Sequence, residues 1–110
     1  MNRELFDFVA KLEKRFNIIN YVKSFSKVKN GWATCPIHSG DEPLMFVERK
    51  NGFNFFICGV CRSYGGLIGL QMHHLNQSFY EVIERLAKEA NIEIPASIIE
   101  EVKAYKSRKK

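Results

Sequence analysis

Long apolar runs are missing from the 110-residue sequence. No stretch approaches the roughly 20 consecutive apolar residues that cross a bilayer, and the first five residues lack the basic-then-apolar order of a secretion signal. We therefore expect a soluble, cytoplasmic protein with no membrane partner.

Aspartate is also scarce, because the chain contains only Asp7 and Asp41 and no Asp-x-Asp pair. Two-metal nucleotidyl transfer needs clustered acids that hold its ions a few ångströms apart. We therefore expect that the chain on its own is not an enzyme.

Cysteine occurs three times, an odd number that does not suit a disulfide framework. The cysteines fall instead into the pairs Cys35-x-x-His38 and Cys58-x-x-Cys61, which are separated by 19 residues. Two such pairs supply the four tetrahedral ligands that zinc favours. The sequence predicts one zinc ion held by Cys35, His38, Cys58 and Cys61; the alternative is three small buried thiols and a surface histidine that share this spacing by chance.

A zinc site with four protein ligands leaves no position for water or substrate, so we expect the ion to be structural. Zinc deaminases need His-x-Glu before Pro-Cys-x-x-Cys, and neither element is present. A nucleophilic cysteine is disfavoured because the metal uses all three thiols. A regulatory redox role for the Cys-x-x-Cys thiolates is the alternative that stays open.

Two Asn-Gly pairs indicate tight turns between short strands. The first joins expected strands at 26–29 and 32–35, and the second joins strands at 44–50 and 53–58. Because each hairpin leads to one ligand pair, we expect Cys35 and Cys58 to end neighbouring strands and the ion to clamp one edge of the sheet. On the second strand of the later hairpin, Phe53 and Phe55 should share one face and Asn54 and Phe56 the other.

Helices are expected on both sides of this sheet in the sequence. Asn2 and Asn17 are candidate caps of two N-terminal helices, and the apolar run 67–75 predicts a largely buried third. Ser78 and Glu81 form a capping box for a helix that Asn91 ends, and Ser97 with Glu100 predicts a second box. The fold class is therefore α+β, a zinc ribbon with a small antiparallel sheet from two hairpins, flanked by N-terminal and C-terminal helices.

The order of these motifs resembles the zinc-binding domain of bacterial and phage DNA primases, a CHC2-type zinc finger. Leu44 and Met45 replace the usual Ser-Phe step, 62–64 lengthens the turn before the glycines, and Leu67 stands where an acid is common. These departures indicate a divergent branch, such as one from a phage or mobile element. The agreements are Cys35, Pro36, His38, Asp41, Glu42, Pro43, Val47, Cys58, Cys61, Gly65, Gly66 and the ending 86–95.

The resemblance implies a zinc ribbon that engages single-stranded DNA template in primer initiation during replication, with polymerase chemistry in a separate domain. It implies residues 1–95 as a primase-type zinc-binding domain, and 96–110 then form a C-terminal helix and basic tail. A primase catalytic domain, a helicase or a polymerase is the expected protein partner.

The distribution of charge agrees with DNA binding by the middle of the chain. The net charge of +5 is unevenly spread, because residues 23–62 carry +3 and residues 63–102 carry −4. Cations that track phosphates beside aromatic faces are typical of single-strand binders. We expect the face carrying Lys27, Lys29, Arg49 and Lys50 to bind DNA. The full set of candidate DNA-binding residues is Lys27, Lys29, Trp32, Arg49, Lys50, Phe55 and Arg62.

A second interpretation is a zinc-stabilised interaction module that docks a replication protein through acidic helices. Residues 63–102, with their net charge of −4, would repel a phosphate backbone, and this charge favours contact with a protein. Its acidic candidates are Glu81, Glu84, Glu89 and Glu93.

Overall fold

A computed structural model describes residues 3–38 and 42–108. The expected cap Asn2, the family position Asp41 and the tail residues Lys109 and Lys110 lie outside the described residues. The helices and strands are α1 (Arg3–Arg15), α2 (Ile18–Lys23), β1 (Trp32–Ala33), β2 (Met45–Lys50), β3 (Phe53–Cys58), β4 (Tyr64–Gly65), α3 (Leu67–Leu75), α4 (Phe79–Ala90) and α5 (Ala96–Arg108). No helix among them is both long and apolar enough to span a bilayer.

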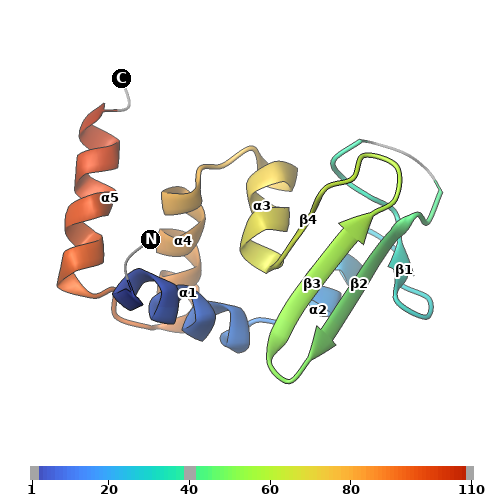
Figure 1. The fold of residues 1–110 in the computed structure, drawn as a ribbon, viewed down its shortest axis with the longest axis horizontal. Helices are drawn as coiled ribbons and strands as arrows, with labels where there is room; N and C mark the ends of the chain where they lie inside the picture. The colour runs from blue at the N-terminus through green and yellow to red at the C-terminus, as the bar shows by residue number, and fades with distance from the viewer. Residues whose placement is uncertain (1–2, 39–41, 109–110) are drawn as a thin grey trace.

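The strands form one antiparallel sheet in the order β1-β2-β3-β4 (Figure 1). Helix α2 contacts β2, while α1, α3 and α4 pack together beside the sheet and α5 lies at the far end of the molecule. The α+β class and the small antiparallel sheet confirm the expected fold. Strand β4, in the stretch expected to be only a lengthened turn, was not predicted.

Apolar side chains gather in two core clusters. The helical cluster joins α1, α3, α4 and α5, and α5 adds the buried residues Ile98 and Val102 to it. The sheet cluster joins α2, the strands and α3, and it includes Cys35 and Cys58. Phe16 packs against both clusters, so the end of α1 connects the two halves of the core.

Local sequence signals explain most of the helix ends. The Asn17 side chain accepts the backbone N–H groups of Ile19 and Asn20, and Ser78 with Glu81 makes the expected reciprocal capping box. Asn91 ends α4 in the left-handed conformation, as predicted. Helix α3 has the predicted bounds.

The second capping box prediction is wrong. Helix α5 begins at Ala96, and the N–H groups of Ile98 and Ile99 both bond to the carbonyl of Pro95. Ser97 instead donates its hydroxyl to the carboxylate of Glu4 on α1. A long-range partner therefore takes the side chain that local sequence assigned to a cap.

The strand expected at 26–29 is also wrong, because only Lys29 pairs, in an isolated bridge to Trp32. The Ser26 hydroxyl accepts the N–H of Thr34 at 3.0 Å and donates to the carbonyl of Lys27. A serine side chain thus replaces backbone ladder bonds at this position. The Asn-Gly turn itself is present, with positive φ at Asn30 and Gly31.

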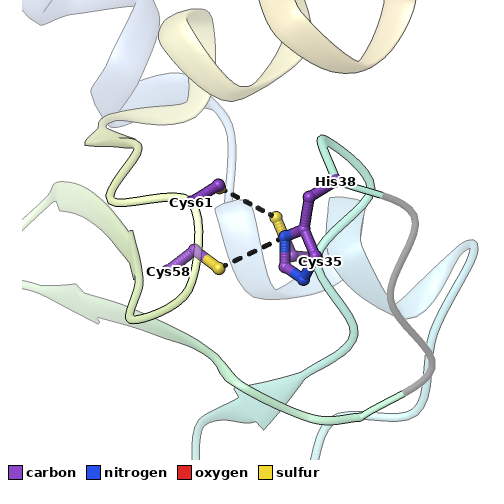
Figure 2. A group of neighbouring side chains, drawn as sticks. All are labelled: Cys35, His38, Cys58 and Cys61. Carbon is purple, nitrogen blue, oxygen red and sulfur yellow. Dashed lines mark hydrogen bonds between the residues drawn. The ribbon is translucent and has the colours of Figure 1, made fainter.

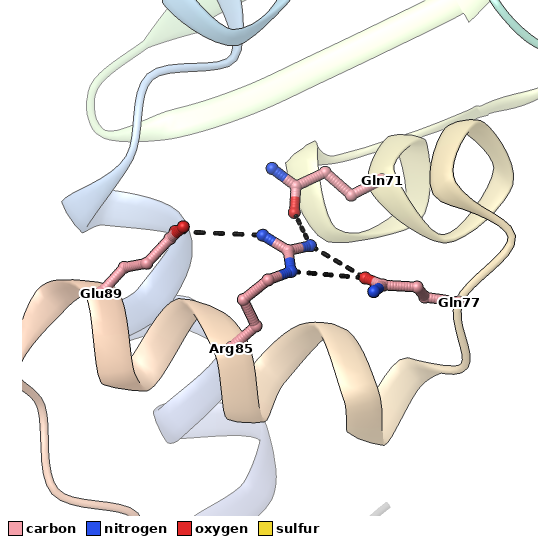
Figure 3. Close-up of polar contacts among 4 residues, drawn as sticks. All are labelled: Gln71, Gln77, Arg85 and Glu89. Carbon is pink, nitrogen blue, oxygen red and sulfur yellow. Dashed lines mark hydrogen bonds and ion pairs between the residues drawn. The ribbon is translucent and has the colours of Figure 1, made fainter.

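Helices α3 and α4 are tied together by Arg85 (Figure 3). Its guanidinium donates to the side-chain oxygen of Gln71 at 2.6 Å and to that of Gln77 at 3.0 and 3.3 Å. Glu89 lies 3.9 Å away on the other side. Gln71 is almost fully buried, so this network fixes α3, which packs against the sheet, to the helical half.

Candidate metal centre and nucleic-acid interface

The four predicted ligands come from two turns that face each other (Figure 2). Cys35 and His38 lie in the turn after β1, whereas Cys58 ends β3 and Cys61 lies in the turn before β4. Their ligand atoms all lie within 4.8 Å of one another. Residues distant in sequence are therefore brought to a single point.

The distances between these atoms match a tetrahedral zinc site. Sulfur ligands about 2.3 Å from zinc lie about 3.8 Å apart at a tetrahedral angle, and a nitrogen shortens that separation slightly. The Cys35 and Cys61 sulfurs are 3.8 Å apart, and the Cys58 sulfur is 3.5 Å from Nδ1 of His38. The site thus fits one zinc ion.

Backbone hydrogen bonds shape both turns. The N–H of Arg62 bonds to the carbonyl of Cys58, and the N–H of Cys58 bonds to that of Ser63. In the other turn the N–H groups of Ile37 and His38 point at the Cys35 sulfur. Such N–H groups favour a thiolate over a thiol.

The electrostatic environment differs between the thiols. Burial raises the pKa of Cys35 to about 11, despite the N–H groups that favour its thiolate. Burial also acts to raise the pKa of Cys61, but hydrogen bonds from Ser63 outweigh it and lower that pKa to about 6. Because a coordinating thiol is deprotonated outright, zinc supplies the charge that Cys35 needs to remain buried as a thiolate.

The ligands do not lie on neighbouring strands as expected. Strand β2 lies between β1 and β3, and Met45 pairs with Ala33 on one side and with Cys58 on the other. Strands β1 and β3 run in the same direction, so their carboxyl ends meet at one end of the sheet. The site therefore clamps that end, across β2, and not an edge.

Comparison with known proteins agrees with this geometry. The CHC2 zinc-finger family matches residues 4–102. The chain belongs to this family. It is 32% identical over 92 residues to a DNA primase of Pseudomonas putida and 30% identical to one of Haemophilus influenzae, covering 80% of this chain in both cases. A DNA primase of Buchnera aphidicola is 28% identical over 94% of this chain.

This zinc finger spans only 14%, 15% and 18% of the length of those three primases, respectively. Most of each relative therefore has no counterpart in these 110 residues, which correspond to the zinc-finger portion. No solved structure is significantly similar to it.

The outer face of the sheet in this zinc finger carries a continuous row of paired side chains. Lys29 pairs with Trp32, Trp32 with Phe46, Phe46 with Ile57, and Ile57 with Tyr64. Directly paired residues share a face, so the row crosses all four strands. We call it the outer row: Lys29, Trp32, Phe46, Ile57 and Tyr64.

Much of this face is exposed. Trp32 is 47% exposed and Tyr64 73% exposed, and on β3 Phe53 and Phe55 are also exposed. As predicted, Phe53 and Phe55 lie opposite to the buried Asn54 and Phe56. Contiguous apolar exposure of this kind is typical of binding surfaces.

Most of the candidate DNA-binding residues surround this face. Trp32 and Lys29 belong to the outer row, and Lys50 pairs with Phe53 on the same face. Phe55 is exposed beside them, and Lys27 and Arg62 are exposed in the flanking segments. Phe46, Ile57 and Tyr64 were not among the candidates, because their place on this face depends on strand pairing that the sequence does not reveal.

The expectation that Arg49 shares a face with Lys50 is wrong. Adjacent strand residues point to opposite faces, and Arg49 pairs with the buried Asn54 on the inner face. Its guanidinium donates to the carbonyls of Lys14 and Phe16 at the end of α1. Arg49 therefore joins α1 to the sheet.

Three of the four acidic docking candidates have intramolecular partners. Glu81 accepts the Ser78 N–H, Glu84 lies 2.9 Å from the ammonium of Lys106, and Glu89 faces Arg85. Glu93 is exposed. The acidic helices thus present less unpaired charge than the sequence indicates.

Proposed function

We propose that this zinc finger engages single-stranded DNA template during primer initiation, through the outer face of its sheet. The observation that supports the proposal is the outer row, with two exposed aromatic residues and a lysine in register across four strands. Bases stack on aromatic side chains for about 1–3 kcal/mol each, and cations beside them track the backbone.

Charge on this face supports an anionic partner, and the exposed aromatic rings beside it favour a nucleic acid. Lys29 and Lys50 lie on the outer face beside the aromatic residues, and Lys27 and Arg62 are exposed close by in the chain. Glu48, which pairs with Phe55, is the acid among them. The face is therefore apolar with a net positive rim.

We propose that the catalytic site belongs to a separate domain or partner protein. A tetrahedral site with four protein ligands has no open position for substrate, so the ion acts by holding the sheet. Since the similar proteins are DNA primases, we propose that the module acts with a primase catalytic domain, a helicase or a polymerase in the cytoplasm.

Fluorescence anisotropy of a labelled single strand, titrated with zinc-loaded protein across salt concentrations, tests the proposal. If the four cations each neutralise one phosphate, log affinity should fall against log salt with a slope of about −3. Replacing Lys29 and Lys50 with Glu should weaken binding to all sequences and reduce the slope.

A matched control replaces the exposed lysines Lys11 and Lys88 on α1 and α4 with Glu, which changes the net charge equally. This variant should keep a slope close to that of the parent. Equal losses in both variants, or no binding by the parent, would reject the sheet face as a DNA site and favour a protein-docking role.

A further inference from the structure

A notch interrupts the outer face where the sheet meets the turn that carries Cys61. It has a volume of about 340 Å³ and is lined by Trp32, Leu44, Ile57, Gly59 and Val60. Trp32 and Ile57 belong to the outer row, so the notch is continuous with the proposed DNA-binding face. The lining contains no titratable side chain, so it does not suit a charged ligand.

The Trp32 ring forms one wall of this notch. It meets Phe46 edge to face, with centroids 5.4 Å apart and planes at 62°, and it remains 47% exposed. An indole supported by a second ring on one side and open on the other is suited to stacking a planar group.

Cations lie next to the notch, while none lies inside it. Lys29 and Trp32 exchange backbone hydrogen bonds of 2.9 and 3.0 Å, which places the lysine beside the indole on the same face. Arg62 follows Gly59 and Val60 in the turn, and it is exposed. An apolar cavity flanked by positive charge matches a nucleotide, which joins an apolar base to an anionic phosphate.

We propose that the notch receives one unstacked base of the template strand and favours a purine, with the adjoining phosphates at Lys29 and Arg62. This inference rests on the proposed function. The purine preference follows because apolar walls select by stacking area and not by hydrogen bonding to base edges. Occupancy would fix the position of the template relative to the zinc site.

Gly59 gives a way to fill the notch without disturbing the fold. A Cβ added there meets no atom within 4 Å, and its φ lies outside the left-handed region. Because Gly59 lines the notch, Gly59→Val adds apolar volume at its wall. Gly69→Val is the matched control, because a Cβ on Gly69 of α3 also meets no atom within 4 Å beyond the adjacent backbone of its own helix.

The intrinsic fluorescence of the protein reports on the notch directly, because Trp32 is the only tryptophan in the sequence. Zinc-loaded protein is titrated with end-labelled thymidine strands of about eight nucleotides, with and without one central adenine. Anisotropy measures total binding, and Trp32 emission measures occupancy of the notch.

We expect the adenine strand to bind at least about threefold tighter than the all-thymidine strand, a fraction of the stacking of one base, and to quench Trp32 more strongly. Gly59→Val should bind both strands equally, whereas Gly69→Val should retain the difference.

The other outcomes separate this inference from the proposed function. Equal binding of both strands by the parent, with equal Trp32 emission, would overturn the purine site in the notch and leave the proposed function standing. Failure of every strand to bind would overturn the proposed function itself. A preference retained in Gly59→Val would place the purine elsewhere on the face.

Discussion

The side chain of Glu13 joins three elements of the structure. Its carboxylate accepts the N–H groups of Leu67 and Ile68 at 3.1 and 2.9 Å, which caps the start of α3. It also accepts the side-chain amide of Asn54 at 2.8 Å. One side chain thus joins α1, β3 and α3.

Replacing Glu13 with Ala should lower the free energy of unfolding by about 2–3 kcal/mol, because two helix N–H groups and a buried amide lose a charged acceptor. Chemical denaturation of the zinc-loaded protein measures this change. The exposed Glu100 replaced with Ala is the control and should have little effect. Equal midpoints for both variants would contradict the capping role.

His74 should make stability depend on pH. Burial lowers its pKa below the ordinary 6.5, and its Nδ1 lies 2.6 Å from the hydroxyl of Tyr21. A histidine with a lowered pKa binds fewer protons folded than unfolded, so its contribution is complete above about pH 6.5 and declines as pH falls below that value.

Melting temperatures of the parent and His74→Gln, measured between neutral pH and pH 5 at fixed zinc, test this expectation. The parent should lose stability more steeply than the variant. His73→Gln, at the exposed neighbouring position, should follow the parent, and the zinc ligand His38 is present in all three proteins. Parallel curves for the parent and His74→Gln would rule out this histidine as the cause.

At the scale of elements, the turn before β1 depends on a close approach of backbone and ring. Gly31 has φ of +87°, and a Cβ there would lie 2.6 Å from the ring of Phe46 in the outer row. The turn and the row are therefore coupled, since Phe46 pairs with Trp32 on the same face.

Gly31→Ala should destabilise the protein by about 1–2 kcal/mol or more, because it adds a steric clash to an unfavourable backbone conformation. Denaturant unfolding followed by Trp32 fluorescence measures the effect. Gly59→Ala meets open space and serves as the control. Wild-type stability in Gly31→Ala would show that the ring moves aside freely.

At the scale of the whole molecule, we expect the two core clusters to respond differently to the metal. The sheet cluster contains Cys35 and Cys58, whereas no zinc ligand belongs to the helical cluster. Structural zinc contributes about 10–16 kcal/mol in zinc-finger peptides, comparable to the entire stability of a domain. The sheet half therefore depends on the ion more than the helical half.

Removing zinc with a strong chelator should abolish the cooperative unfolding of the sheet and retain part of the helical circular dichroism. Trp32 emission follows the sheet half, and added zinc should restore it. Cys35→Ser should resemble the chelated protein. A metal-free protein that still melts cooperatively near the parent temperature would contradict the structural role of zinc.

The sequence determined the features that depend on neighbouring residues. The ligand pairs, both Asn-Gly turns, the Ser78 box and the bounds of α3 follow from interactions within a few residues. Such local preferences act in any context, so they can be recognised without knowing what packs against them. The family resemblance rests on the same short motifs.

Tertiary structure decided which distant residues meet. It placed β2 between β1 and β3, the strands that lead to the zinc ligands, and it aligned the outer row across four strands. It also directed Arg49 inward to α1 and brought Ser97 within hydrogen-bonding distance of Glu4. The physical reason is that a strand exposes alternate residues to two faces, and only packing selects which face is covered. Local sequence made the two ligand pairs, and long-range strand pairing brought them together and made the surface beside them.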